Sequence, residues 1–132
     1  VTKEIRDIVI RLVDAVSTKG VHVDKALLYG SFATGKQTVD SDLDIAIISN
    51  DFGRDRFNEG KMLMQLAWRI DARLHPVPVS ADSYKNDTWV PLIHEIREHG
   101  VEVAENFHPA FTNWMTFTNF DGLKWTLVGG AK

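Results

Sequence analysis

A glycine-serine pair, Gly30-Ser31, stands ten residues before two aspartates, Asp42 and Asp44, which lead into the apolar run 45–48. Short apolar runs that polar residues introduce are typical of buried strands. Because side chains alternate between the two faces of a strand, Asp42 and Asp44 should project from the same face. The sequence therefore predicts a tight turn followed by a strand that carries two carboxylates at its start.

Both halves of this pattern suit phosphate chemistry. Gly30 lets the backbone approach a phosphate without a Cβ in the way, and the Ser31 hydroxyl and nearby amides offer donors. Two close carboxylates repel each other unless a cation lies between them, and oxygen ligands shared with phosphates suit Mg²⁺. An Asp-x-Asp pair alone can also mark only the polar entrance of a strand. The two motifs in this order favour phosphoryl or nucleotidyl transfer.

The composition limits the class of protein. The chain has 132 residues, of which 44% are hydrophobic, so we expect a single domain with one core. Its 15 basic and 18 acidic residues give a net charge of −3, and the basic residues are scattered, which disfavours general nucleic-acid binding. There is no cysteine, which excludes disulfides and thiolate metal sites. Neither a leader-like segment nor a long apolar span is evident, so we expect a cytoplasmic protein.

Apolar periodicity and turn residues predict the order of the elements. They indicate, in order, a helix over about 2–19 that ends at Gly20, a strand at 23–29, a helical turn within 31–36, a strand at 42–49, a helix over about 56–71, a strand at 73–79, a turn or short helix at 80–85, a helix capped by Thr88 that ends at Gly100, and a strand at 101–103.

Two further expectations concern packing. Pro76 and Pro78 lack amide donors, so the strand at 73–79 should lie at an edge of the sheet. Trp68 and Trp89 should widen the apolar faces that their helices turn toward the core.

The motif residues 30–35 and 40–47 resemble the signature of the DNA polymerase beta-like nucleotidyltransferase superfamily, specifically its minimal nucleotidyltransferase (MNT) branch. The ten-residue gap resembles that of MNT antitoxins, which pair with HEPN toxins. The resemblance extends over about residues 1–103. It implies an α+β fold over residues 1–104, with a mixed sheet of about three to five strands flanked by helices. Residues 105–132, rich in aromatics, would form a tail that packs on the domain or on a partner.

The resemblance also assigns roles to residues of the motif. In the family, the glycine and serine hold a nucleoside triphosphate and the two aspartates bind Mg²⁺. By position, Gly30 and Ser31 would bind the phosphates of ATP, while Asp42 and Asp44 would bind metal, with two Mg²⁺ ions expected. Lys36 follows the turn and is a further candidate for the γ-phosphate, although a loop lysine is more often simply solvated.

The family's third carboxylate, on a later strand, falls on His75 in this chain. A neutral imidazole can act as a general base, but it is a poorer ligand for Mg²⁺ than a carboxylate. Three alternatives follow: His75 substitutes in the catalytic site, Asp71 fills the role after a shift of register, or the site binds nucleotide with little turnover.

Three functions are therefore possible. In the first, the chain transfers AMP from ATP to a hydroxyl of a partner protein, a HEPN ribonuclease toxin that it silences as the antitoxin. In the second, the acceptor is a small molecule, with a second copy in a homo-oligomer completing the site. In the third, the chain is a nucleotidyltransferase-like binding protein with weak activity or none. We rank them in that order.

Overall fold

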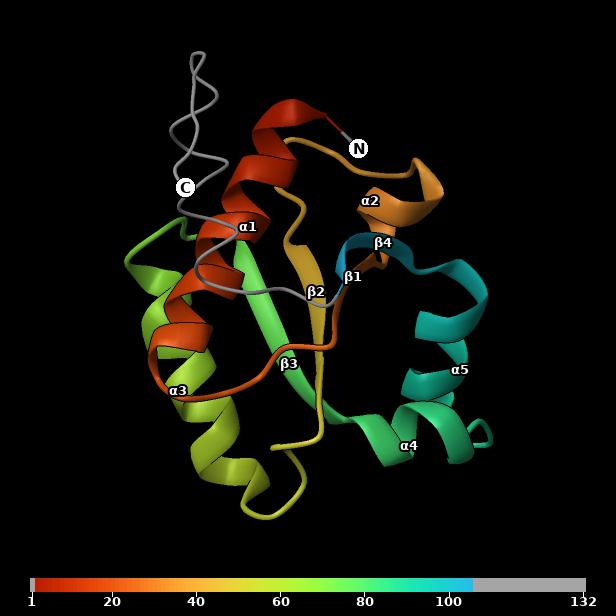
Figure 1. The fold of residues 1–132 in the computed structure, drawn as a ribbon. Coiled ribbons are helices and arrows are strands. Elements are labelled where there is room, and N and C mark those ends of the chain that lie inside the picture. The colour runs from red at the N-terminus through yellow and green to blue at the C-terminus, as the bar shows by residue number, and fades with distance from the viewer. Residues whose placement is uncertain (1, 106–132) are drawn as a thin grey trace, which may run out of the picture.

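The computed structural model describes residues 2–105, which form one mixed β-sheet with helices on both faces (Figure 1). The strand order is β3-β2-β1-β4. β2 pairs antiparallel with β1 and parallel with β3, and β4 pairs antiparallel with β1. The strands are β1 (Lys25–Tyr29), β2 (Leu43–Ser49), β3 (Leu74–Ser80) and β4 (Val101–Glu105). The expected α+β fold with a mixed sheet is confirmed.

Helices on both faces make the sheet the middle layer of the domain. α1 and α3 cover one face, and α4 and α5 cover the other (Figure 1). The single turn α2 follows β1 directly and lies at the end of the sheet where β2 begins. The helices are α1 (Lys3–Thr18), α2 (Ser31–Thr34), α3 (Arg56–Trp68), α4 (Ala81–Asn86) and α5 (Pro91–His99).

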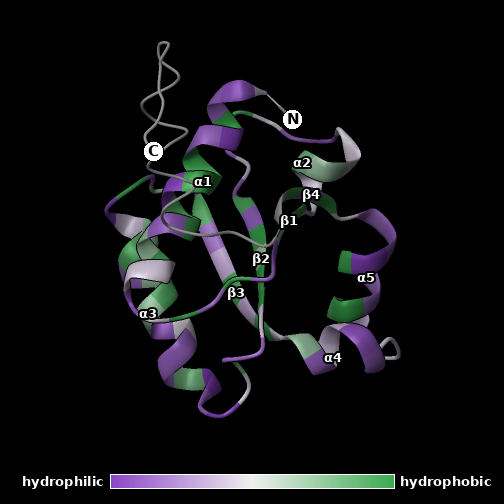
Figure 2. Ribbon diagram, viewed as in Figure 1, coloured by the Kyte–Doolittle hydropathy of each residue, from purple (hydrophilic) through white to green (hydrophobic). Residues whose placement is uncertain are grey.

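β2 is buried on both faces because helices cover both sides of the sheet. Leu43, Ile45 and Ile47 point into the core shared with α1 and α3. Ala46 and Ile48 point into the smaller core shared with α5. Figure 2 accordingly draws β2 mostly in the colour of hydrophobic residues. Alternation along this strand decides which way the motif carboxylates face.

α1 agrees with the expected helix within one residue at each end. Its N-cap Thr2 accepts a hydrogen bond from the amide of Ile5 at 3.2 Å, an interaction worth about 1 kcal/mol. Gly20, with φ of +88°, takes the left-handed conformation just after the helix. The helix buries one stripe at three- and four-residue spacing, made of Ile5, Ile8, Val9, Leu12, Val13 and Val16.

β3 is an edge strand, as its prolines predict. In a parallel pair, alternate residues of a strand direct their backbone groups toward the neighbour. Pro76 and Pro78 are two residues apart, so both can face the open side of β3, where no ladder bond is lost.

Three details of the sequence prediction are wrong. Trp68 is 75% exposed because α3 packs through Leu63 and Ala67, and the residue after Ala67 points away from that stripe. Trp89 is 79% exposed because it lies in the turn before α5, not on the helix. The N-cap of α5 is Val90, not Thr88, since the amide of Val90 donates to Asp87 O at 3.0 Å to close that turn.

β4 continues two residues beyond the expected strand at 101–103. The expectation that residues 105–132 form an aromatic tail concerns, beyond Glu105, residues that lie outside those described. Among the described helices, none is both long enough and apolar enough to cross a membrane.

Candidate functional site

The turn between β1 and α2 requires glycine at position 30. Gly30 has φ of +74° and ψ of −148°, a combination that residues with a side chain avoid. A Cβ built on Gly30 would collide with Oδ2 of Asp44 and would lie 3.3 Å from its Cγ. The carboxylate of Asp44 therefore packs directly against the backbone of the turn.

The turn continues into the single helical turn of α2. The amides of Ala33 and Thr34 donate to Gly30 O at 3.1 and 3.2 Å, and the amide of Lys36 donates to Ser31 O at 2.9 Å. The first amides of a helix have no acceptor within the helix, so they point outward from its N-terminal end. Ser31 is half-buried, whereas the side chain of Lys36 is exposed.

Asp42 and Asp44 lie at the start of β2. Leu43 is buried against α1 and α3, so the strand directs the carboxylate of Asp44 to the face covered by α4 and α5. Asp44 is half-buried and Asp42, just before the strand, is exposed. The charge of Asp42 contributes to the raised pKa of Asp44, so the two carboxylates lie near each other. That they share one face stays a prediction.

Asp44 is the middle of a row of three residues across the sheet. In the pairing of β1 with β2 it is opposite Tyr29, and in the pairing of β2 with β3 it is opposite His75. Residues paired in register share a face, so the three side chains project together beside Gly30. The pairing of β2 with β3 therefore places His75, which is exposed, next to Asp44. The resemblance assigned both residues to the same site.

The electrostatics of the row follow from burial and neighbouring charge. Burial raises the pKa of the Asp44 carboxyl, the nearby His75 opposes this shift, and the charge of Asp42 adds to it. Burial also raises the pKa of the Tyr29 phenol to about 12, with further contributions from the carboxylates of Asp44 and Glu95. The site is thus rich in negative charge, and a bound cation would relieve the repulsion.

The donor set suits Mg²⁺ held jointly with a triphosphate. Among residues 2–105, no three His, Asp or Glu side chains converge as a metal site. Mg²⁺ commonly takes one or two protein carboxylates and completes its coordination with water and substrate phosphates. Asp42 and Asp44 meet that requirement, and the carboxylate of Asp44 lies directly against the backbone of the Gly30 turn.

Asp71 belongs to a different part of the molecule. Its carboxylate forms an ion pair with Arg73 at 2.9 Å and also accepts the Arg73 amide at 2.8 Å. These bonds lower the pKa of Asp71. Asp71 lines a shallow hollow with residues of α1, on the other face of the sheet from Asp44. The geometry disfavours Asp71 as the third carboxylate.

Sequence reasoning missed two polar groups near the site, Tyr29 and Glu95. Tyr29 could have been found, because it directly precedes Gly30 and strand pairing places it opposite Asp44. Glu95 gives no such signal, since its place depends on how α5 packs on the sheet.

The mixed four-stranded sheet with flanking helices is a small nucleotidyltransferase fold. The family model "Polymerase beta, Nucleotidyltransferase" matches residues 11–107, and the chain belongs to this family. No curated protein matches the sequence.

Solved structures share the fold at low sequence identity. A crystal structure from Sulfolobus solfataricus, provisionally named a nucleotidyltransferase, has 14% identity and a TM-score of 0.58, covering 77% of this chain and 81% of that one. A toxin-antitoxin structure with AMP-PNP has 18% identity and a TM-score of 0.51, covering 88% and 86%. A toxin-antitoxin structure named MntA-HpeT has the same identity and coverage, with a TM-score of 0.48.

Proposed function

We propose that this chain is a Mg²⁺-dependent nucleotidyltransferase that transfers AMP from ATP to a hydroxyl group of a partner protein, and that it acts as the antitoxin of a HEPN-type toxin. Membership of the nucleotidyltransferase family supports the type of reaction. The toxin-antitoxin structure with AMP-PNP, an analogue of ATP, supports the nucleotide and the partner class as proposals.

One observation carries this proposal: the carboxylate of Asp44 fills the space that a side chain on residue 30 would need. A glycine turn suited to phosphates and a carboxylate suited to a divalent cation are therefore adjacent.

In the proposed reaction, the triphosphate lies over the turn. Gly30 lets the chain turn beside Asp44, and the amide and hydroxyl of Ser31 donate to the phosphate oxygens. Asp42 and Asp44 would hold Mg²⁺, which when bound neutralises the triphosphate and makes the α-phosphorus more electrophilic. The acceptor oxygen forms a bond to the α-phosphorus, the bond from that phosphorus to the bridging oxygen breaks, and pyrophosphate leaves.

His75 is the proposed proton acceptor. It is opposite Asp44 on the neighbouring strand and is exposed, so an acceptor hydroxyl from outside can reach it. An imidazole nitrogen of neutral His75 takes the proton of that hydroxyl as the new bond to phosphorus forms. The nearby carboxylate of Asp44 would stabilise the resulting imidazolium.

A second candidate function is nucleotide binding with little turnover. It is favoured by one observation, the lack of a third carboxylate grouped with Asp42 and Asp44 among the described residues. This candidate predicts the same nucleotide site and differs only in the chemical step.

The experiment that tests the proposal combines the full chain, Mg²⁺, ATP labelled at the α-phosphate, and the protein encoded by the neighbouring gene. We expect label to join the partner protein, with a mass increase of one adenylyl group. The variants Asp42→Asn and Asp44→Asn should abolish this transfer. Asp51→Asn is the matched control, since Asp51 lies beyond the far end of β2 and accepts a hydrogen bond from the His22 amide.

Three outcomes decide between the candidates. Transfer to the partner supports the first function. Binding of Mg·ATP without transfer supports the second candidate. Transfer at the unchanged rate by Asp42→Asn or Asp44→Asn would refute the metal assignment.

A further inference from the structure

α3 carries an exposed apolar stripe on the side away from the core. Phe57 is 79% exposed and Trp68 is 75% exposed, although both are large hydrophobic residues. Lys61 and the half-exposed Met64 lie between them at spacings of four, three and four residues, so all four share one side of the helix. The core contacts of α3 are made from another side, through Leu63 and Ala67.

The C-terminal half of this stripe is hollowed. Met64, Gln65, Trp68 and Arg69 line a shallow depression of about 440 Å³. Exposed aromatic residues beside such a depression are typical anchors of protein interfaces. The stripe lies on the opposite side of the sheet from Asp44, so it is distinct from the nucleotide site.

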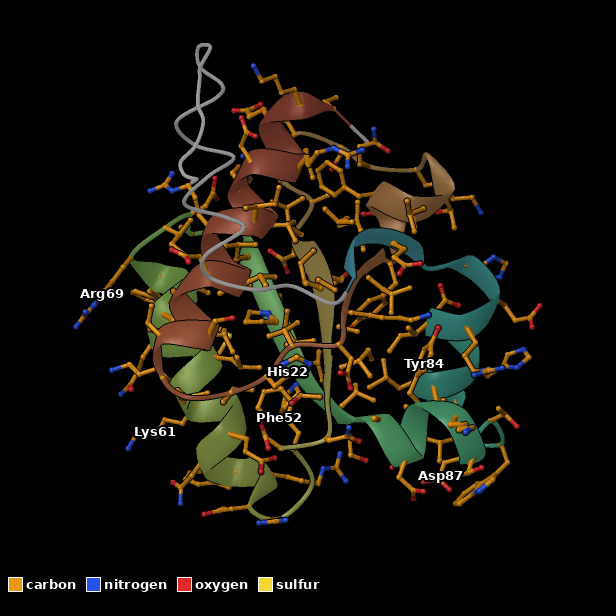
Figure 3. All side chains as sticks on the ribbon, viewed as in Figure 1. His22, Phe52, Lys61, Arg69, Tyr84 and Asp87 are labelled. Atoms are coloured by element: carbon orange, nitrogen blue, oxygen red, sulfur yellow. The ribbon has the colours of Figure 1, made fainter. Side chains whose placement is uncertain are left out.

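Two basic residues belong to this surface, Lys61 within the stripe and Arg69 at its border. Lys61 and Arg69 extend outward from α3 (Figure 3), and neither has an ion-pair partner among residues 2–105. The two acidic groups near the start of α3 are already engaged. Glu59 accepts the amides of Gly53, Arg54 and Asp55, and Asp55 accepts the amide of Asn58.

The positive charge of Lys61 and Arg69 favours one kind of binding partner for the α3 stripe over another. If two copies of the chain paired through this stripe around a two-fold axis, Lys61 and Arg69 of one α3 would face those of the other. Like charges placed together across an interface are unfavourable. A partner with acidic flanks would instead complement Lys61 and Arg69.

We infer that the α3 stripe is a docking surface for an amphipathic helix of a partner protein, with apolar residues at positions i, i+4 and i+7 and acidic residues on its flanks. Phe57, Met64 and Trp68 receive the apolar residues, and Lys61 and Arg69 pair with the acidic ones. The inference rests on the proposed function only in taking the acceptor to be a protein. The α3 stripe would hold this protein while a hydroxyl of the same protein reaches the nucleotide site.

The test uses a display library of helical peptides that share the apolar spacing and have flanking positions varied among Glu, Lys and Gln. Selection on the full chain should enrich acidic flanks. The selected peptides should bind about tenfold more weakly to Trp68→Ala and to Lys61→Glu/Arg69→Glu, and binding should weaken with salt. Trp89→Ala is the matched control, because Trp89 is as exposed as Trp68 but lies outside α3.

Other occupants give distinct results. The chain has no cysteine, so Gln65→Cys introduces a single thiol beside the stripe. We expect this thiol to react with a maleimide as fast as a free peptide thiol does. Slow reaction would mean that another part of this chain or a second copy covers the stripe, and would overturn the inference. Dissociation of a dimer by Trp68→Ala would overturn it as well.

Failure of this inference can be told from failure of the proposed function. Selection of uncharged or basic flanks, or no enrichment, refutes the docking surface, whatever the nucleotide result. Trp68→Ala should bind Mg·ATP as well as the unaltered chain does. Loss of label transfer with acidic helices still selected would instead refute the proposed reaction.

Discussion

Replacement of Gly30 by alanine should couple to Asp44 in a measurable way. Residue 30 has φ of +74° and ψ of −148°, and forcing a residue with a side chain into this region costs about 1–3 kcal/mol. The added Cβ would also collide with Oδ2 of Asp44, and displacing a packed group of this kind costs about 1–3 kcal/mol more. Gly30→Ala should therefore lower the free energy of unfolding by about 2–6 kcal/mol.

The two contributions separate in the Asp44→Ala background. Without the carboxylate, the nearest side-chain atom to the new Cβ would be the Cβ of residue 44, at the ordinary contact distance of 3.5 Å. Only the backbone cost, about 1–3 kcal/mol, should then remain. Urea unfolding of the unaltered chain, both single variants and the double variant gives the coupling energy, which we expect to be about 1–3 kcal/mol.

Gly35→Ala is the matched control for this cycle. Gly35 has φ of +76°, and no atom lies within 4 Å of a Cβ built there. Its replacement should cost about 1–2 kcal/mol whether or not Asp44 is present. If Gly30→Ala costs the same in both backgrounds within about 0.5 kcal/mol, the packing of Asp44 against the turn is refuted.

Three further predictions concern Asp44, Asp71 and His75. Asp44→Asn should raise the unfolding midpoint of metal-free protein by about 1–3 °C at pH 7 while abolishing transfer. The pKa of Asp44 is raised in the folded state, so its carboxylate lowers the stability of the fold above that pKa. The higher midpoint of Asp44→Asn should therefore disappear as pH falls to the unfolded-state pKa near 3.8. A midpoint difference that did not depend on pH would contradict this. Asp71→Asn should cost about 0.5–1 kcal/mol at pH 7 in urea unfolding without changing Mg·ATP affinity. Since the pKa of Asp71 is lowered, the stabilisation by Asp71 is present above the unfolded-state pKa of 3.8 and is lost as pH falls through the folded-state pKa. Weaker Mg·ATP binding by Asp71→Asn would instead indicate that Asp71 belongs to the nucleotide site. His75→Ala should slow single-turnover transfer about 100-fold and His75→Glu should restore it, whereas unchanged rates in both would exclude His75 as the base.

The fold could be predicted from local patterns because most elements have unambiguous signals. The stripe of α1 and the stop at Gly20 are both readable from sequence. The prolines of β3 identify an edge strand without knowledge of its neighbours. These features depend on spacing and on backbone chemistry, which are local.

The exposed tryptophans could not be predicted in the same way. Trp68 extends an apolar pattern that continues around α3, and only packing through Leu63 and Ala67 decides which side faces the core. Trp89 lies beside a helix start whose position depends on the turn closed by Val90 and Asp87. In both cases a hydrophobic residue is available to the core, but the tertiary arrangement uses others.

In the candidate site too, some features follow from local sequence and others require pairing between distant strands. The position of Asp44 on the face opposite Leu43 follows from alternation along one strand. The position of His75 opposite Asp44 requires the register between β2 and β3, which connects residues far apart in sequence. The contact between Asp44 and Gly30 likewise requires the pairing of β1 with β2.

The central claim is that Asp42 and Asp44 hold Mg²⁺ on a triphosphate seated on the Gly30-Ser31 turn. A crystal structure of the full chain with Mg²⁺ and a non-hydrolysable analogue of ATP tests it most directly. We predict phosphate oxygens within hydrogen-bond distance of Ser31, with a metal ion shared between the phosphates and both carboxylates. A triphosphate bound elsewhere, or carboxylates without metal beside a bound triphosphate, would contradict the claim.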